Sequence, residues 1–323
     1  MIKILKSLLL ISSLMFSFPG SSVELPTIRI GVLAFGTTNW ELAALGNQKL
    51  LDNARFKLEI HKLANPQAGK LALKANAVDI IVTDWLWVSS MRTRGSDYSF
   101  YPYSTASGSL LVANDSNIKT LTELRGKHLG IAGDELDRNW LLLQTLAQQQ
   151  KFDLNKDVKK SFGAPPLLSQ QLLDHHIDAV LTFWHYAAQL EPQGYHALIT
   201  GNEILKGLGI QVPMANIGYV FKQSWAQANK EALENFIKLT QQARNKLCDA
   251  DAAWQPIVPL LKTADIAVQA KLRQGYCDGR INEWGKPQLE AADKIFSLIR
   301  AISGNKLTGE ATAIEPGTFW NNQ

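Results

Sequence analysis

Short apolar runs alternate with amphipathic stretches through the first hundred residues of the chain. The apolar runs are typical of buried strands, and the stretches between them follow the period of a helix. We expect strands at 28–34, 56–63 and 78–82, and helices from 40 to about 51 and from Pro66 onward. Strands and helices that alternate with short connections predict a doubly wound parallel sheet.

The same alternation returns in a second region, with expected strands at 128–132, 177–183 and 197–199 and a helix at 137–150. A further apolar strand at 215–221 precedes long amphipathic helices at 230–247, 264–274 and 288–303. Amphipathic helices pack their apolar face against a sheet, and no helix predicted so far covers one face of the first sheet. We therefore expect an α/β protein of two lobes, in which the chain crosses between lobes near 109–114 and again near 212–219. The expected division is lobe I at 23–112, lobe II at 113–215 and the rest of lobe I at 216–323.

The N-terminus carries the pattern of a secretory signal. Lys3 and Lys6 precede an apolar run at 8–18, and small residues follow at 20–22. Because that run is shorter than the roughly 20 residues that span a bilayer, we expect a signal peptide at 1–22 and a mature protein in the periplasm. An N-terminal membrane anchor that is never cleaved is the alternative.

Composition narrows the classes of partner and of chemistry. The chain has 33 Lys and Arg against 29 Asp and Glu, and the basic residues are scattered, which argues against nucleic acid or a membrane surface as partner. No Ser-His-Asp signature, glycine-rich nucleotide turn or zinc spacing is present. We expect no enzymatic activity, no cofactor and no metal. Cys248 and Cys277 lie in an exported chain, where either a disulfide or two buried thiols fits.

Polar and aromatic residues follow the expected strands. Thr83, Asp84 and Trp85 come directly after the strand at 78–82. In open α/β sheets the ligand binds at the carboxyl ends of the strands, where neighbouring connections diverge. A small-molecule site is therefore the leading hypothesis.

Five segments in this order and spacing resemble the type II periplasmic solute-binding proteins of ABC importers, in the nitrate, sulfonate, taurine and thiamine-precursor group. The segments are Ile28-Arg-Ile-Gly, Leu71-x-x-Lys-Ala-Asn-Ala-Val-Asp-Ile, Gly108-Ser-Leu-Leu-Val, Ile118-Lys-Thr-Leu-Thr-Glu-Leu-Arg-Gly-Lys-His-Leu-Gly-Ile and Leu172-Leu-Asp-His-His-Ile-Asp-Ala-Val. The resemblance implies two α/β lobes joined by a hinge of two crossovers, which close around a solute. It also implies a monomer that delivers this solute to a permease and its ATPase in the inner membrane.

The resemblance places the solute against loops at 36–40, 83–85, 105–108, 133–138 and 182–186, and against Asn216 at the second crossover. The candidate ligand-binding residues are Thr37, Thr38, Asn39, Trp40, Thr83, Asp84, Trp85, Thr105, Ser107, Asp134, Arg138, Trp184, His185 and Asn216. The tryptophans are suited to stacking on a flat or cationic solute, and core packing is their alternative role. Of the neighbours Trp85 and Trp87, the former is expected at the cleft. Asp84 either binds a ligand ammonium or caps a helix.

The loop at 133–138 departs from the family pattern. Sulfonate binders commonly have small residues at this helix N-terminus, whose free N–H groups meet the anion. Here Asp134, Glu135 and Asp137 crowd the same turn, so we expect a solute that is aromatic, amine-bearing or partly cationic. Arg138 is the counter-argument, because it suits a carboxylate or phosphate; an ion pair with Asp134 is its alternative role. His185 either donates to the ligand or bonds to backbone.

Two other functions fit the same scaffold. Thiamine-pyrimidine synthases share this fold, but the cysteine-rich iron motif of that family is absent here. A periplasmic accessory or sensor protein, which presents its ligand to a partner other than an importer, remains the alternative to the importer component.

Overall fold

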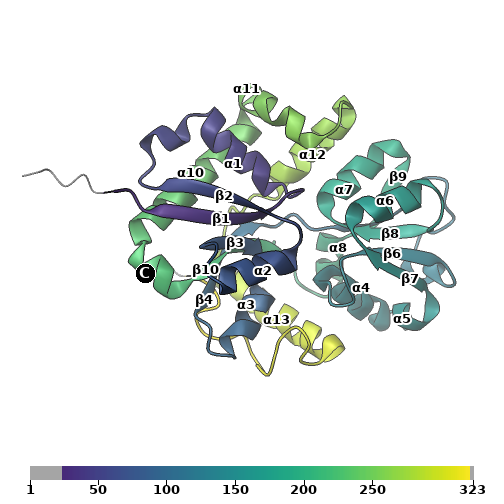
Figure 1. Ribbon diagram of the computed structural model, residues 1–323. Coiled ribbons are helices and arrows are strands. Elements are labelled where there is room, and N and C mark those ends of the chain that lie inside the picture. The colour runs from purple at the N-terminus through teal and green to yellow at the C-terminus, as the bar shows by residue number, and fades with distance from the viewer. Residues whose placement is uncertain (1–23, 321–323) are drawn as a thin grey trace, which may run out of the picture.

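The computed structural model describes residues 24–320 and shows two lobes side by side, joined by a narrow connection (Figure 1). The expected signal peptide at 1–22 lies outside the described residues. Each lobe is built on one five-stranded sheet with helices on both faces. Within the described part of the chain, no helix combines the length and the apolar character that crossing a membrane requires.

The sheet of lobe I has the strand order β2-β1-β3-β10-β4. Its strands are β1 (Thr27–Leu33), β2 (Lys57–Leu63), β3 (Ile80–Thr83), β4 (Tyr98–Ser104) and β10 (Ile217–Lys222). The helices of this lobe are α1 (Thr38–Asn47), α2 (Pro66–Lys74), α3 (Trp85–Arg92), α9 (Gln223–Ala228), α10 (Lys230–Asp249), α11 (Asp251–Trp254), α12 (Ile266–Asp278) and α13 (Lys286–Ser303). Short 3₁₀ turns lie at Leu50–Asn53 and Gln255–Leu261.

The sheet of lobe II has the order β7-β6-β8-β5-β9. Its strands are β5 (Ser109–Ala113), β6 (His128–Ala132), β7 (Lys159–Gly163), β8 (Ala179–Thr182) and β9 (Tyr195–Thr200). Its helices are α4 (Arg138–Gln149), α5 (Leu154–Asp157), α6 (Pro165–Leu173), α7 (Trp184–Leu190) and α8 (Gly201–Gly207), with 3₁₀ turns at Leu121–Leu124 and Glu191–Gln193.

Both sheets are mixed, whereas the sequence pattern predicted parallel ones. β1 is parallel to β2 and β3, and β6 is parallel to β7 and β8, as expected. β10 runs antiparallel to β3 and β4, and β5 runs antiparallel to β8 and β9. The parallel strands point their carboxyl ends toward the other lobe, so a strand that starts at the connection runs the opposite way.

The two connections between lobes are short. β4 ends at Ser104 and β5, which already belongs to the second sheet, begins at Ser109. The expected division after residue 112 thus falls within β5. The return connection follows α8 and leads into β10, where the backbone N–H of Asn216 donates to the carbonyl oxygen of Ser104 at 2.8 Å. The two connecting segments are therefore hydrogen-bonded to each other.

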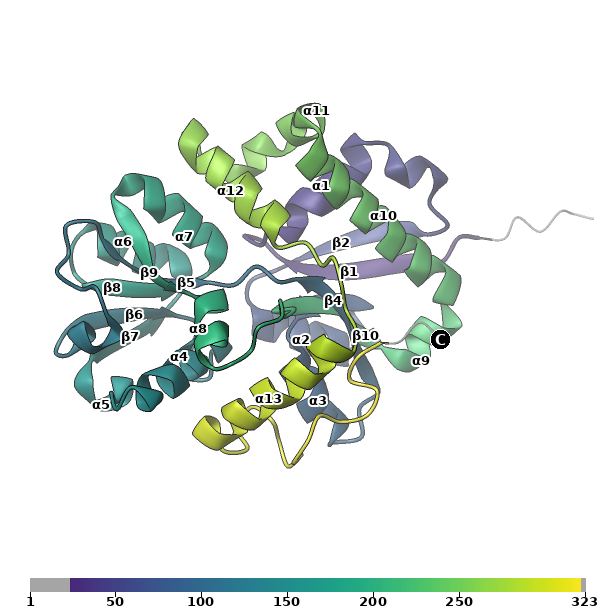
Figure 2. The same ribbon diagram turned by 180° about the vertical axis from the view of Figure 1, so that it is seen from behind.

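Two helices of the C-terminal part also reach the other lobe. α12 packs against α7, and α13 packs against α4 (Figure 2). Ile295 and Phe296 of α13 share one apolar cluster with Leu142 and Leu146 of α4. The lobes are thus held together by helix packing on both sides of the connection.

The C-terminal tail is attached to lobe I by backbone hydrogen bonds and by ring packing. The backbone N–H of Phe100 donates to Thr318 at 2.7 Å, and that of Trp320 donates to Phe100 at 2.9 Å. The Phe319 ring packs against Trp85 and Trp284. The tail therefore extends the core of the lobe.

Candidate functional site

The carboxyl ends of four parallel strands face the junction of the lobes. β1 and β3 bring the loops at 36–40 and 83–85 to one edge of the first sheet, and β6 and β8 bring those at 133–138 and 182–186 to one edge of the second. The connecting segments lie between these edges. The loops that carry the candidate residues therefore lie at the facing edges of the two sheets.

Arg138 and Asn216 join the two connecting segments to lobe II. The Nη2 group of Arg138, the first residue of α4, donates to Oδ1 of Asn216. The amide nitrogen Nδ2 of Asn216 donates in turn to the carbonyl oxygen of Thr105 at 2.8 Å. Asn216 is 9% exposed, so this chain of contacts lies inside the junction.

Arg138 also has an acidic neighbour in lobe I. Burial lowers the pKa of the Arg138 guanidinium, while the negative charges of Asp84 and Asp137 act in the opposite direction. Asp84 is the N-cap of α3 and accepts from the backbone N–H of Trp87 at 2.9 Å. Asp84 therefore fulfils the capping role and still places its charge near Arg138 of the other lobe.

Arg138 does not pair with Asp134, which was the alternative that the sequence left open. The Asp134 carboxylate instead accepts from the backbone N–H of Leu136 at 2.9 Å and is exposed. The Asp134 carboxylate therefore stabilises its own turn.

Asp137 was not among the candidate residues, but its carboxyl group is a titratable group at the lobe junction. It caps α4 by accepting from the backbone N–H groups of Asn139 and Trp140 at 2.9 and 3.1 Å. Burial raises the pKa of its carboxyl from 3.8 to about 6, against the effect of those hydrogen bonds and of Arg138. Its position before the helix signalled a cap, but its burial at the lobe junction was not visible in the sequence.

Two tryptophans meet across the lobes. The ring centroids of Trp40 in α1 and Trp184 in α7 lie 6.1 Å apart, edge to face. Trp40 is 6% exposed and also packs on Trp254 and Tyr276 of its own lobe. Trp184 is partly exposed, so it is the tryptophan of the pair with surface left for a ligand.

A cavity of about 310 Å³ lies beside Trp184. Thr105 and Ser107 of the first connection line it, together with Lys271 and Gln274 of α12. The α12 wall was not among the candidate residues, because an amphipathic pattern gives the buried face of a helix and not its partner. This volume is at the small end of the range for ligand sites.

Trp85 lies in the core, so its expected place at the cleft is corrected. It is fully buried and its ring packs against Phe319 of the C-terminal tail at 5.7 Å. The tail is distant in sequence, and it covers the position where Trp85 emerges from the sheet. Its neighbour Trp87 stacks on Tyr98, with ring centroids 5.2 Å apart.

Asn39 holds its own loop instead of offering its amide nitrogen to a ligand. Its Nδ2 donates to the carbonyl oxygens of Leu33 and Gly36, both at 2.7 Å. Thr37 and Thr38, at the start of α1, are buried, with exposures of 9% and 5%. Thr83 is also buried, and its hydroxyl lies 3.4 Å from the carboxylate of Asp84.

His185 is a partly exposed residue whose two ring nitrogens have no hydrogen-bonding partner among the described residues. Both ring nitrogens are inaccessible, and neither finds a donor or acceptor among the described residues. Burial lowers the pKa of the imidazole from 6.5 to about 4, so the ring is neutral at pH 7. The expected alternative of a bond to backbone is therefore not realised. An unpartnered imidazole is costly unless something binds it.

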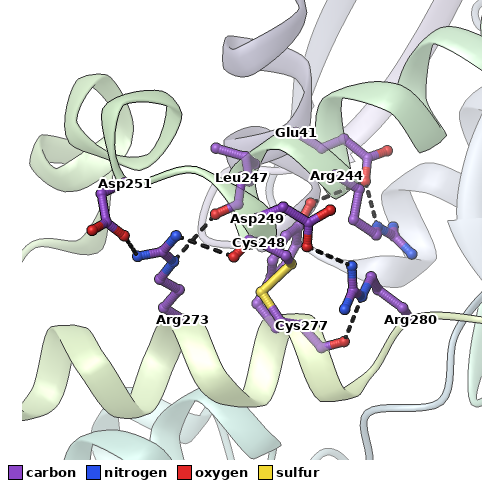
Figure 3. The surroundings of a disulfide bond; sticks show 10 residues. Glu41, Arg244, Leu247, Cys248, Asp249, Asp251, Arg273, Cys277 and Arg280 are labelled. Atoms are coloured by element: carbon purple, nitrogen blue, oxygen red, sulfur yellow. Dashed lines mark hydrogen bonds and ion pairs between the residues drawn. A yellow bond between two sulfur atoms is a disulfide. The ribbon is translucent and has the colours of Figure 1, made fainter.

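Cys248 and Cys277 form a disulfide between the ends of α10 and α12, so the bridge that the sequence allowed is present (Figure 3). The residues next to Cys277 support the junction. Gly279 accepts from the backbone N–H of Thr105 at 2.9 Å. Gly275 lies so close to Trp184 that a Cβ there would sit 2.8 Å from the indole ring. The disulfide thus anchors one wall of the inter-lobe cavity.

The family model described as NMT1/THI5 like matches residues 57–250, which include most of both sheets. The chain belongs to the NMT1/THI5-like family. A search of curated proteins finds no match.

Solved structures share the fold of this NMT1/THI5-like protein. The alkanesulfonate-binding protein SsuA from Xanthomonas axonopodis pv. citri, bound to MOPS, has a TM-score of 0.70 at 15% identity, covering 93% of this chain and 99% of its own. The periplasmic aliphatic sulphonate-binding protein SsuA from Escherichia coli has a TM-score of 0.69 at 19% identity, covering 91% and 92%. The ligand-binding component of an ABC-type import system from Staphylococcus aureus has a TM-score of 0.65 at 17% identity, covering 85% and 91%. The fold is that of type II periplasmic binding proteins.

Proposed function

We propose that this protein is the extracytoplasmic solute-binding component of an ABC importer and captures a small organic solute between its lobes. The observation that supports this best is the inter-lobe cavity beside Trp184, lined by the connecting segment and by α12. A solute there touches both lobes and the hinge, so binding favours the closed arrangement. The permease and its ATPase in the inner membrane are the proposed partners, and the protein acts without catalysis as a monomer.

The charges at the junction favour an amine-bearing or aromatic solute over a plain sulfonate. Asp84 and Asp137 do not line the inter-lobe cavity themselves. They lie near the guanidinium of Arg138, which donates to Asn216 and through it reaches Thr105 of the cavity wall. Two N–H groups at the N-terminus of α4, those of Asn139 and Trp140, already donate to the Asp137 carboxylate and are not free to bind an anion. A solute cation adds a favourable partner to this acidic surrounding, whereas a sulfonate meets repulsion.

Calorimetry with taurine, an alkanesulfonate, nitrate and a pyrimidine amine tests this specificity. The pyrimidine amine is expected to bind most tightly. Asp84→Asn keeps a good helix cap but removes the charge, and it is expected to weaken amine binding by about tenfold, which corresponds to about 1.4 kcal/mol. Glu59→Gln, on the exposed strand β2, is the matched control and is expected to bind like the parent protein. Tight binding of the alkanesulfonate, unaffected by Asp84→Asn, contradicts the proposed solute class.

A further inference from the structure

Lobe I contains a second cavity, of about 300 Å³, that shares no lining residue with the inter-lobe one. It lies between α10 and the β4–β10 edge of the sheet, and residues 280–282 after α12 close one end. Its walls carry two guanidinium groups, Arg244 and Arg280, and the side-chain amides of Gln241, Asn245 and Asn282. Polar walls of this kind differ from the apolar lining of an ordinary packing defect.

Arg244 is nearly buried and fixed in one orientation. Its guanidinium carbon lies 3.8 Å from the centre of the Tyr103 ring, so one face of the group is stacked. Its Nε donates to Glu41 at 2.7 Å, and its Nη1 donates to the carbonyl oxygen of Tyr103. The Tyr103 and Tyr276 hydroxyls also interact with the guanidinium, but within the described residues Nη2 forms no hydrogen bond of normal geometry. A rigid donor edge is therefore left over at a residue that is only 9% exposed.

Glu41 is the acidic group of the cavity, and its acceptors are occupied. Tyr219 donates to one carboxylate oxygen at 2.7 Å, and Tyr276 and Arg244 donate to the other at 3.0 and 2.7 Å. The carboxylate is 1% exposed. Because three donors hold it, Glu41 offsets one positive charge but offers little further capacity to a ligand.

Arg280 brings the second positive charge. Its Nε donates to the carbonyl oxygen of Cys277 at 3.2 Å, and its Nη1 lies 3.3 Å from Asp249. The Nη2 group has no acceptor in the part of the chain that is described. Figure 3 shows Arg280 and Arg244 on the same side of the disulfide, with Arg273 on the other. The disulfide therefore fixes the segment that carries Arg280 beside the cavity.

We propose that this cavity is a second binding site, for a small organic anion that bears carboxylate groups. Two guanidinium groups, from Arg244 and Arg280, line the cavity from two sides, each with N–H donors left without an acceptor in the described part of the chain, and that of Arg244 is buried. A carboxylate matches such donors in charge and in planar geometry. The side-chain amides around them suit further oxygen atoms of the same ligand. The site is independent of the solute proposed for the junction of the lobes.

Calorimetry of the whole mature chain with malonate, its neutral diamide malonamide, and inorganic sulfate tests the proposal. Malonate is expected to bind, with malonamide and sulfate much weaker. Arg280→Gln removes the partly exposed guanidinium and is expected to weaken malonate binding at least about tenfold, since hydrogen bonds to charged groups are the strong ones. Asn245→Leu, which narrows the cavity without removing a charge, is expected to weaken binding as well.

Arg273→Gln is the matched control. Arg273 lies on α12, just before the segment that carries Arg280. It donates to the carbonyl oxygens of Leu247 and Cys248 and pairs with Asp251, but it does not line the cavity. It is expected to leave malonate binding unchanged. The proposal is overturned if malonate binds no better than malonamide, or if Arg273→Gln weakens binding as much as Arg280→Gln. A loss of malonate binding in Arg138→Gln also overturns it, because the anion then occupies the inter-lobe site.

Discussion

Single polar side chains at the lobe junction carry more than one role. Asp84 caps a helix in one lobe and places its charge beside Arg138 of the other. Asn216 bonds to the first connecting segment and to Arg138 at once. Such shared contacts make the packing of the two lobes depend on a few groups, so single substitutions there are informative.

His185 gives a pH-dependent prediction. Its pKa is about 4 in the folded protein, below its ordinary value of 6.5, because the ring is buried. The unfolded chain therefore takes up a proton first, and the folded protein loses stability as the pH falls from about 6.5 toward 4. Between pH 7 and pH 5, the unfolding free energy of the parent protein is expected to fall by about 1 to 2 kcal/mol more than that of His185→Phe. Urea unfolding at both pH values measures this, and parallel pH dependence of the two proteins contradicts it.

Asp137 acts in the opposite direction over a similar range. Its pKa is raised to about 6, so the folded protein holds a proton that the unfolded chain releases, and stability rises as the pH falls through about 6 toward 4. The two groups therefore partly cancel in the parent protein. This is why the His185 effect is read from the difference between variant and parent.

Residue roles could be predicted from the sequence only where local structure decides them. The carboxylates that follow strands were expected at the ends of helices, and Asp84 caps α3 as one of its two proposed roles. The place of Trp85 could not be predicted, because Phe319 covers it from more than two hundred residues away. The cost of the unpartnered His185 likewise depends on packing that no local pattern shows.

At the scale of elements, α12 is the helix that most directly links lobe I to lobe II. It packs on α7, and Lys271 forms an ion pair with Glu191 of lobe II at 3.0 Å. Gly275 allows the close approach to Trp184. The close packing of α12 against Trp184 thus depends on residue 275 having no side chain.

Gly275→Ala is expected to hold the lobes apart. The change favours the helix itself by about 1 kcal/mol, but its Cβ meets Trp184 at 2.8 Å. We expect a larger radius of gyration in small-angle X-ray scattering and weaker solute binding, without loss of lobe stability. Gly46→Ala in α1, where no atom lies within 4 Å, is the control and is expected to keep the parent radius. Equal radii for all three proteins contradict the role of Gly275.

The disulfide gives a second prediction for α12. The bridge closes a loop between residues 29 apart, and loop-closure entropy gives a stabilisation of about 3 to 4 kcal/mol for that length. Cys248→Ala with Cys277→Ala is expected to lower the unfolding free energy by this order and to weaken solute binding, because α12 walls the cavity. Denaturant unfolding and calorimetry check the two effects. A double variant that unfolds like the parent protein argues against the bridge as an anchor.

The sequence predicted most of these elements, including the long helices α10, α12 and α13, because their apolar period is regular. It did not predict that β5 and β10 run against their neighbours. Strand direction depends on where the chain enters a sheet, and that follows from the connection between lobes instead of from the strand's own residues.

At the scale of the whole molecule, the two lobes and the two crossings were predictable from the repeated alternation of strands and helices. The tight packing of α12 and α13 onto the second lobe was not. These contacts show the lobes packed together around a cavity. We expect a protein of this architecture to bind a solute by closing its lobes. The affinity then depends partly on the packing of α12 and α13 against the second lobe.

The central claim is that the lobes enclose a small solute, and native mass spectrometry tests it most directly. The protein, purified gently from its own cells, is predicted to carry one small-molecule adduct per chain. The variant with both Asp84→Asn and Arg138→Gln, purified in the same way, is predicted to have the mass of the bare chain. A parent protein that shows only the bare mass, and gains none when the four calorimetry solutes are added, would contradict the account.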